Sequence, residues 1–292
     1  MIPEEILRKV KLIEIKSRDI VNNIFSGEYH SAFKGSGIEY AETREYVYGD
    51  DVRLIDWNVT AKTGKPYIKI FEEEREQSII LMVDLSASGY FGSNESLKVD
   101  TMIELSSILS FSAIKNNDKV GLLIFSDKIE KFIPPEKGKS HVLRIIRELI
   151  YFNPKSTKTN ISLALDYINK IIKKKSIVFL LSDFIDSKYL KDLRYSNKKH
   201  DLINVLIRDE YESKIFNLGL SKIHDIENDF DYWLDTGNQL NRKEINKFLT
   251  QERNKLILKF KKNNLELIDI IVSSGYIDPL IDFFKKRSLI RK

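Results

Sequence analysis

The sequence contains no cysteine, which excludes disulfides and thiolate ligands for a metal. This absence is typical of proteins from reducing compartments, where disulfides are rare. The four histidines, His30, His141, His200 and His224, stand in dissimilar contexts, and we interpret each as a structural residue. A metal site in this chain is therefore expected to consist of oxygen donors.

Long hydrophobic runs are also missing, since no stretch approaches the roughly 18 to 20 apolar residues that span a bilayer. The first residues include Glu4 and Glu5 instead of the basic and then apolar pattern of a secretion signal. From these two features we expect a soluble, cytoplasmic protein without a membrane span. The 292 residues are 42% hydrophobic, which is enough for a well-buried core.

The chain also lacks a strong excess of one charge. Its 48 Lys and Arg residues against 43 Asp and Glu residues leave a net charge of +5, which is small beside a charged content of 31%. One basic cluster lies beside aromatic residues at 283–292, and we interpret it as the outer face of an amphipathic closing helix. Lysines are otherwise spread over the whole chain, so we expect no nucleic-acid partner, and nucleic-acid binding stays as an alternative.

The first quarter of the chain has two textures. Residues 4–24 place apolar side chains at helical spacing, which predicts an amphipathic helix. Residues 26–76 alternate glycine turns with short runs rich in Tyr, Val and Ile, which predicts a small irregular β segment with no helix of its own. We therefore divide the chain into residues 1–76, with the helix and the β segment, and residues 77–292, with the main domain.

The main domain alternates apolar runs with helical patterns, and continuous apolar runs are typical of strands buried on both faces of a sheet. The expected fold class is α/β, with a doubly wound, mostly parallel sheet flanked by helices. Residues 129–133 are expected to form an antiparallel edge strand and residues 223–234 further edge strands. The expected parallel strands are 78–83, 120–125, 176–181, 202–207 and 265–271, and the expected helices are 97–114, 140–151, 161–173, 244–262 and 279–286.

Five oxygen-bearing side chains follow two of these strands or precede a helix. Asp84, Ser86 and Ser88 come directly after the first strand, and Asp183 follows the third. Thr159 precedes the helix that begins near residue 161, so all five are expected at the carboxyl edge of the sheet. Two carboxylates and three hydroxyls suit Mg²⁺, or Mn²⁺, with the hydroxyls as direct ligands, the carboxylates acting through bound water, and one position open.

Each of these residues taken alone has a simpler explanation. Serines after a strand are common in turns, Thr159 suits the start of a helix, and Asp183 suits a cap of the next turn. The hypothesis of a metal site depends on their joint placement at strand ends.

The order of these residues resembles a known site. Asp84, Ser86 and Ser88 form a D-x-S-x-S element similar to that of the metal-ion-dependent adhesion site of von Willebrand factor A domains. Thr159 matches the threonine of that site and Asp183 its second aspartate. The resemblance implies a doubly wound fold and a metal that takes its sixth ligand from a Glu or Asp carboxylate of a partner protein.

Motifs upstream of the predicted site are more specific. They are Gly35-Ser36-Gly37-Ile38-Glu39-Tyr40, Arg44-Glu45-Tyr46, Gly49-Asp50-Asp51-Val52-Arg53, Ile55-Asp56-Trp57-Asn58 and Tyr67-Ile68-Lys69. With the metal motif they resemble bacterial proteins of domain of unknown function family 58, clearly over residues 31–183 and loosely beyond. The resemblance implies a cytoplasmic partner of MoxR-type AAA+ ATPases, which are similar to chaperones acting on client complexes.

These features predict a non-catalytic adaptor or co-chaperone that uses a divalent ion to bind an acidic side chain of another protein. The alternative enzyme is a metal-dependent phosphotransferase or phosphatase with Asp84 as nucleophile. Such enzymes need a second aspartate where this chain has Ser86, and the chain has no P-loop motif.

The segment 35–76 supports a separate hypothesis, namely a docking surface of its own. It is dense in the residue types that anchor interfaces, which are Tyr40, Tyr46, Tyr48, Trp57, Tyr67, Arg44, Arg53 and Arg75. The alternative is that these aromatic side chains pack the segment onto the sheet, with Trp57 in the core.

Overall fold

The chain folds into two compact units, which are described one at a time. The computed structural model describes residues 4–22, 29, 32–33, 39–72, 76–90, 92, 97–153, 156, 158–186, 188–225 and 230–290. The main unit comprises Met1–Ala32 and Ser78–Lys292, and the small unit is Phe33–Gln77.

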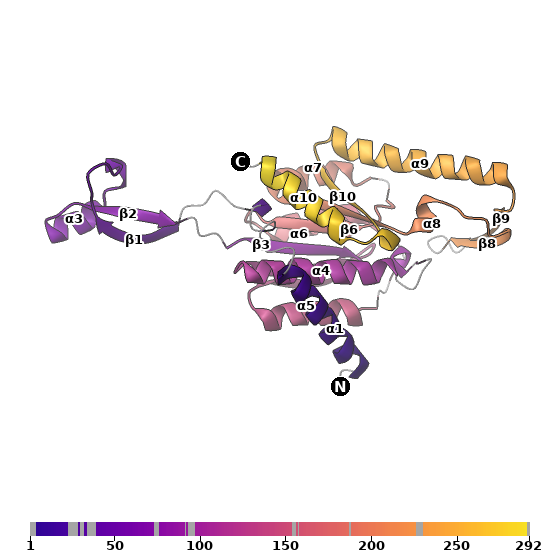
Figure 1. Ribbon diagram of the computed structural model, residues 1–292, viewed down its shortest axis with the longest axis horizontal. Helices are drawn as coiled ribbons and strands as arrows, with labels where there is room; N and C mark the ends of the chain where they lie inside the picture. The colour runs from indigo at the N-terminus through magenta and orange to yellow at the C-terminus, as the bar shows by residue number, and fades with distance from the viewer. Residues whose placement is uncertain are drawn as a thin grey trace. The chain divides into compact units, whose positions relative to one another are not determined.

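A six-stranded sheet forms the centre of the main unit (Figure 1). Its strand order is β10-β7-β6-β3-β4-β5, and every neighbouring pair is parallel except β4 with β5. The predicted fold class, a doubly wound and mostly parallel sheet flanked by helices, is therefore confirmed. The strands are β3 (Ser78–Asp84), β4 (Lys119–Phe125), β5 (Ile129–Glu136), β6 (Ile177–Ser182), β7 (Asp201–Arg208) and β10 (Glu266–Ile271).

Helices cover both faces of this sheet. On one face, α6, α7 and α9 enclose a core that contains Met82, Leu180 and Phe260, all at most 1% exposed. Figure 1 shows α4 and α5 on the other side of the sheet. The helices of the main unit are α1 (Glu4–Ile20), α4 (Lys98–Lys115), α5 (Lys139–Tyr151), α6 (Ile161–Ile171), α7 (Leu190–Lys199), α8 (Glu210–Ser213), α9 (Gln239–Lys262) and α10 (Ile277–Ile290), with short 3₁₀ turns η3 (Ala87–Tyr90) and η4 (Val272–Ser274).

The helix α7 was not expected from the sequence. Its ten residues include three lysines and one arginine, and only Leu193 and Ser196 are buried. With so few buried positions, the apolar spacing that predicts a helix is weak here.

Helix α1 belongs to the main unit, whereas the division predicted from the sequence grouped it with residues 26–76. It packs against α4 and α5, with Ile13 only 7% exposed. Two ion pairs join α1 to α4, Lys9 to Asp100 at 2.9 Å and Lys16 to Glu104 at 2.7 Å. The sequence pattern shows that α1 has an apolar face but not which element covers it.

Strands β8 (Leu220–Asp225) and β9 (Phe230–Asp235) form a separate antiparallel sheet of two strands. The expectation that residues 223–234 extend the main sheet is therefore wrong. The edge beside β7 is occupied by β10, which pairs with β7 over six residues.

The small unit contains the antiparallel pair β1 (Glu39–Glu45) and β2 (Tyr67–Glu72), the turn η2 (Val52–Leu54) and the helix α3 (Trp57–Thr63). The expectation that this segment has no helix is wrong. Asp56 begins α3 by accepting hydrogen bonds from the backbone N–H of Asn58 and Val59, a standard helix start. Trp57 is 71% exposed and Tyr48 fully exposed, so Trp57 is not a core residue.

Within the residues that the structure describes, no helix is long and apolar enough to cross a membrane. The expected closing helix is present as α10, and its Phe284 is fully buried.

Candidate metal site at the carboxyl end of the sheet

The loop after β3 brings the first three predicted residues together. Asp84 is the last residue of β3 and is 2% exposed, because β3 lies between β4 and β6. Its Oδ1 accepts a hydrogen bond of 3.1 Å from the backbone N–H of Ser86. The hydroxyls of Ser86 and Ser88 lie 3.1 Å apart and are hydrogen bonded to each other. The loop thus directs one carboxylate and two hydroxyls to one place.

The end of β6 supplies the second side of the site. The hydroxyl of Ser182 donates to Asp84 Oδ2 over 2.7 Å and accepts from the backbone N–H of Phe184 over 3.0 Å. Asp183 follows directly and is 6% exposed, with its Oδ1 accepting from the backbone N–H of Ile185 over 3.3 Å. Both β3 and β6 therefore end in the same group of buried oxygen atoms.

Thr159 reaches the site from the start of α6. Its hydroxyl lies 3.5 Å from Asp84 Oδ1 and donates to it. Asn160 caps α6, because its side chain accepts from the backbone N–H of Leu163 over 3.0 Å. The backbone N–H of Asn160 also donates to the carbonyl of Ser126 at the end of β4 over 2.9 Å, which fastens this segment to the sheet.

Burial and the neighbouring charge of Asp183 together raise the pKa of Asp84 to about 7, against the hydrogen bonds from Ser182 and Ser86, which lower it. Both causes disfavour the ionised carboxylate. A cation at this place favours the ionised form, because it offsets both causes of the shift.

A lysine lies beside the second carboxylate. Lys98, the first residue of α4, has no exposed surface, and its Nζ donates to Asp183 Oδ2 over 2.8 Å and to Glu212 Oε1 over 2.5 Å. Burial acts to lower the pKa of Lys98, but the charges of Asp183 and Glu212 outweigh it and raise the pKa. Lys98 is therefore a buried cation shared by two carboxylates.

The oxygen donors fit a small, hard divalent ion. Adjacent ligands at about 2.1 Å from an octahedral Mg²⁺ lie about 3.0 Å apart, and the hydroxyls of Ser86 and Ser88 are 3.1 Å apart. Both oxygens of Asp183 already accept hydrogen bonds, which fits a role through bound water. Among the described residues there is no group of three or more His, Cys, Asp and Glu side chains that suits a metal. An ion here would therefore depend on hydroxyl ligands.

All five residues predicted from the sequence thus lie at one end of the sheet, and their role as metal ligands stays a prediction. Sequence reasoning missed Ser182, Lys98 and Glu212. Ser182 shares the end of β6 with Asp183, which is a usable signal, because both residues leave the sheet together. Lys98 and Glu212 carry no such signal, because the chain has 48 Lys and Arg residues and 43 Asp and Glu residues and nothing local singles out these two.

Two of the four histidines have described side chains, and both lie away from this site. His141 is 6% exposed, and its Nε2 hydrogen bonds with the carbonyl of Val120 at 2.8 Å. His200 is 1% exposed at the end of α7, and burial lowers its pKa to about 4, with a contribution from Lys199. His30 and the side chain of His224 lie outside the described residues.

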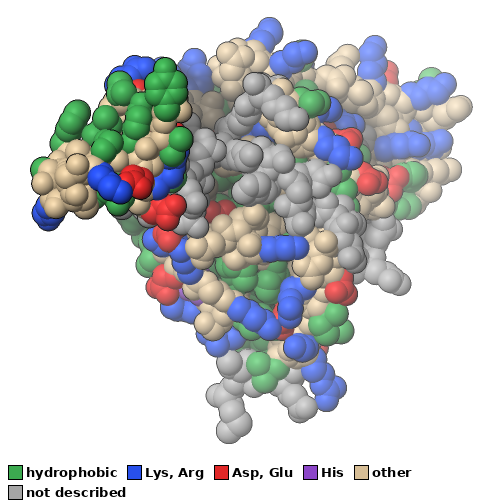
Figure 2. Space-filling view, turned by 60° about the vertical axis from the view of Figure 1, so that its left-hand side comes forward, with side chains coloured by type: hydrophobic (Ala, Val, Ile, Leu, Met, Phe, Trp, Pro, Cys, Tyr) green, Lys and Arg blue, Asp and Glu red, His purple; other side chains and the backbone are tan. Residues whose placement is uncertain are grey.

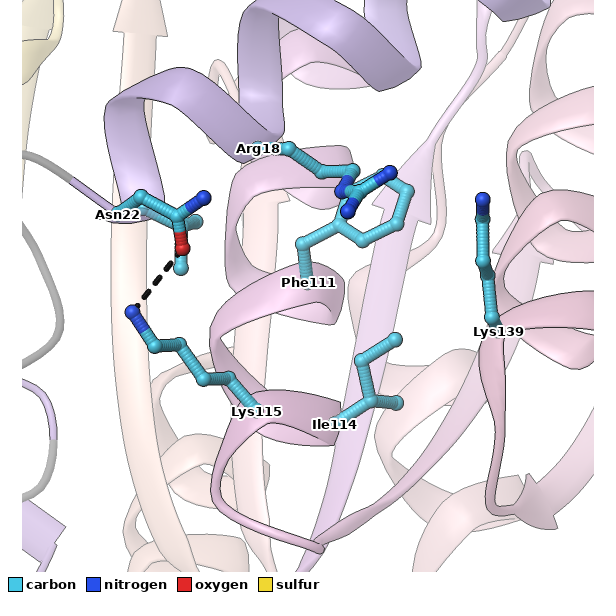
Figure 3. Close-up of a pocket in the computed structure, with 7 residues that line it drawn as sticks. Arg18, Asn22, Phe111, Ile114, Lys115 and Lys139 are labelled. Atoms are coloured by element: carbon cyan, nitrogen blue, oxygen red, sulfur yellow. Dashed lines mark hydrogen bonds between the residues drawn. The ribbon is translucent and has the colours of Figure 1, made fainter.

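A separate pocket of about 260 Å³ lies between α1, α4 and the start of α5 (Figure 3). It is far from the site, because Lys98 and Lys115 are at opposite ends of α4, which is about 25 Å long. Its basic residues have partners: Arg18 and Lys139 pair with Glu14, and Lys115 donates to Asn22 over 3.0 Å. These contacts fasten α1 to its neighbours. The pocket is lined by Arg18, Val21, Asn22, Phe111, Ile114, Lys115 and Lys139.

The mostly parallel sheet with this loop cluster at the carboxyl ends of β3 and β6 places the protein in the doubly wound α/β class. Residues 42–255 match the family described as "Protein of unknown function DUF58", and the chain belongs to that family. The predicted resemblance to domain of unknown function family 58 is thereby confirmed.

Individual similar proteins are distant. The uncharacterized protein Rv1480 of Mycobacterium tuberculosis (strain ATCC 25618 / H37Rv) is 24% identical over 221 residues, which cover 75% of this chain and 70% of that protein. The crystal structure of BatB from Bacteroides thetaiotaomicron has a TM-score of 0.47 and 12% identity, covering 73% of this chain and 99% of BatB. A structure of mussel byssus proximal thread matrix protein 1 with a zinc-occupied MIDAS motif has a TM-score of 0.37 and 18% identity. The match covers 46% of this chain and 38% of that protein.

Proposed function

We propose that this protein is a non-catalytic interaction module, which binds a divalent ion, Mg²⁺ or Mn²⁺, at the carboxyl end of its sheet and uses it to hold a carboxylate of another protein. The observation that carries the proposal is the convergence of three hydroxyls on one buried carboxylate, in Ser86, Ser88, Thr159 and Asp84. An ion held largely by neutral hydroxyls keeps much of its positive charge. It therefore attracts an acidic ligand strongly.

The surroundings of Asp84 favour this function over phosphoryl transfer. A nucleophilic carboxylate needs an oxygen that reaches the substrate. Asp84 is 2% exposed, and both of its oxygens accept hydrogen bonds, Oδ1 from Ser86 and Thr159 and Oδ2 from Ser182. His141 and His200, the histidines with described side chains, are candidate bases but are buried away from the site. Enzymatic activity is therefore not part of the proposal.

The distribution of surface charge favours a protein partner over nucleic acid. Figure 2 shows Lys and Arg side chains scattered over the face in view, with acidic and hydrophobic side chains between them. Nucleic-acid binding typically uses a basic stripe or patch on one face. Oligonucleotide binding that weakens steeply with salt would support the nucleic-acid alternative instead.

The test of the proposed function is ion binding by titration calorimetry, using Mg²⁺ and Mn²⁺ with the full-length protein and Asp84→Ala. We expect binding to the unaltered protein and none to Asp84→Ala, with the circular dichroism spectrum unchanged. Lys170→Ala is a matched surface control, since Lys170 pairs with Asp166 on the exposed side of α6. Equal binding to Asp84→Ala and the unaltered protein would refute the site.

The family resemblance supports a finer proposal about the partner. We propose that the protein works in the cytoplasm as an adaptor or co-chaperone of a MoxR-type AAA+ ATPase, which acts on client complexes. Affinity capture from lysate in Mg²⁺ and again with chelator tests it. Recovery of such an ATPase or its client only with Mg²⁺ is the expected result, and identical recovery with chelator contradicts a metal-bridged contact.

The small unit offers a second docking surface. Its exposed aromatic side chains include Tyr48, which is fully exposed, and Trp57 at 71%, and aromatic anchors of this kind dominate many interfaces. Replacing Trp57 by Ala is expected to weaken partner recovery without changing ion affinity. Unchanged recovery would remove the small unit from the interface.

A further inference from the structure

Lys98 combines two unfavourable features in one residue. Its side chain has no exposed surface, and burial of an ammonium group is unfavourable unless its charge is compensated. It is also the first residue of α4, after the N-cap Leu97, where the helix dipole disfavours a positive charge. A neutral side chain would avoid both costs. The retained charge therefore indicates a function at this place.

The contacts of Lys98 connect that charge to the candidate metal site. Its Nζ lies 2.8 Å from Asp183 Oδ2 and 2.5 Å from Glu212 Oε1. The second Glu212 oxygen accepts from the backbone N–H of Asp209 over 3.0 Å, so α8 holds Glu212 against Lys98. Lys98 thus joins Asp183, at the end of β6, to Glu212 in α8.

The charges around the site explain what Lys98 does to an ion. Without Lys98, ionised Asp84, Asp183 and Glu212 place three negative charges around the site, and with it the sum is two. A positive charge beside a divalent ion weakens its binding by electrostatic repulsion. Because Lys98 also engages Asp183 Oδ2, this oxygen is withheld from direct coordination.

We propose that Lys98 is an internal counter-ion of the carboxylates at the metal site. It keeps Asp183 out of direct contact with the ion and keeps the ion affinity low until a carboxylate of a partner protein adds its negative charge. Glu212 is the acidic residue that retains Lys98 there. Lys98 and Glu212 are therefore positioning residues of the site. This inference rests on the proposed function, since it presupposes a divalent ion beside Asp84.

The test uses Lys98→Met, which keeps the length of the side chain and removes its charge, and Glu212→Gln, which keeps the shape and removes the opposite charge. Mn²⁺ affinity is measured by titration calorimetry on full-length folded protein. We expect Lys98→Met to bind Mn²⁺ at least about tenfold more tightly and Glu212→Gln about threefold or more weakly. The double variant is expected to return to within about threefold of the unaltered protein.

Opposite signs separate this role from a structural one, because a variant that only disorders the site itself weakens ion binding in both cases. Arg287→Met is the matched control. Arg287 is also buried and shared by two carboxylates, Asp201 and Glu266, but at the amino ends of β7 and β10. The Mn²⁺ affinity of Arg287→Met is expected to be unchanged.

Each outcome decides between the two proposals. Binding to the unaltered protein that is not tightened in Lys98→Met overturns the role of Lys98 and leaves the metal site. Binding that appears only in Lys98→Met supports the counter-ion and overturns metal binding by the natural chain. An absence of binding in both overturns both. If Lys98→Met does not fold, Glu212→Gln decides alone, since weaker binding supports the inference and equal or tighter binding refutes it.

Discussion

Both ends of the main sheet bury a basic side chain between two carboxylates, and the two arrangements differ in their surroundings. At the amino end, Arg287 pairs with Asp201 on β7 and Glu266 on β10. Arg287 lies in the last turn of α10, where the helix dipole favours a positive charge. Its Nε also donates to the carbonyl of Ala32 over 3.3 Å. This cation joins the end of the chain to the sheet.

At the carboxyl end, Lys98 pairs with Asp183 and Glu212, but it lies at the start of its helix, where the dipole opposes it. The hydroxyls of Ser86 and Ser88 nearby bond to each other. The buried charges at the amino end thus stabilise the fold. The carboxyl end holds an energetically unfavourable charge beside oxygen donors. This difference supports the binding role proposed for the carboxyl end.

The largest expected effect on stability belongs to the amino end. Arg287→Met leaves Asp201 and Glu266 without their shared cation, and breaking a buried pair costs about 3 to 5 kcal/mol. Urea unfolding measures the loss. The comparison fails if this variant is as stable as the unaltered protein or if its Mn²⁺ affinity changes.

The next effect comes from pH and again concerns the amino end. The pKa of buried His200 is lowered to about 4 from 6.5, so its contribution to stability is complete above pH 6.5 and is lost as the pH falls toward 4. Within the described part of the chain, neither ring nitrogen has a hydrogen-bond partner. At pH 5 the loss is about 2 kcal/mol. His200→Leu is expected to lose this acid sensitivity in urea unfolding at pH 7.5 and pH 5, and equal sensitivity would contradict the assignment.

A smaller effect on stability, coupled to ion binding, is expected at the carboxyl end. Ser182→Ala removes the hydroxyl that donates to Asp84 Oδ2 over 2.7 Å, at a cost of about 1.5 kcal/mol. The pKa of Asp84 then rises further, so the ion affinity at pH 7 falls several-fold. Calorimetry at pH 7 and pH 8.5 checks this, since the deficit is expected to shrink at the higher pH. Undiminished affinity at pH 7 would separate Ser182 from the site.

The smallest effect concerns the cap of α6. Asn160→Ala removes the hydrogen bond to the backbone N–H of Leu163 and costs about 1 kcal/mol. Because Thr159 precedes the cap, a looser helix start is expected to weaken Mn²⁺ binding a few-fold. Asn160→Asp retains a capping acceptor and serves as the control. Equal ion affinity in both variants would show that Thr159 is held independently of the cap.

Much of the fold could be predicted from the sequence, because most of the parallel strands are apolar runs. β3 and β6 show this most clearly, with nearly every residue buried. The hairpin β8–β9 and the exposure of Trp57 could not be predicted. Apolar character indicates that a side chain prefers burial but not whether the fold provides a surface to cover it.

The sequence by itself determined the α/β class and the placement of Asp84, Ser86, Ser88, Thr159 and Asp183 at one edge, because parallel strands end together and each of these residues adjoins a strand or helix end. Only the tertiary structure decided the position of Lys98 between Asp183 and Glu212. Its two carboxylates lie 85 and 114 residues further along the chain. Contacts between residues so far apart in the sequence depend on which helix start lies against which strand end. No local pattern of residues encodes that packing.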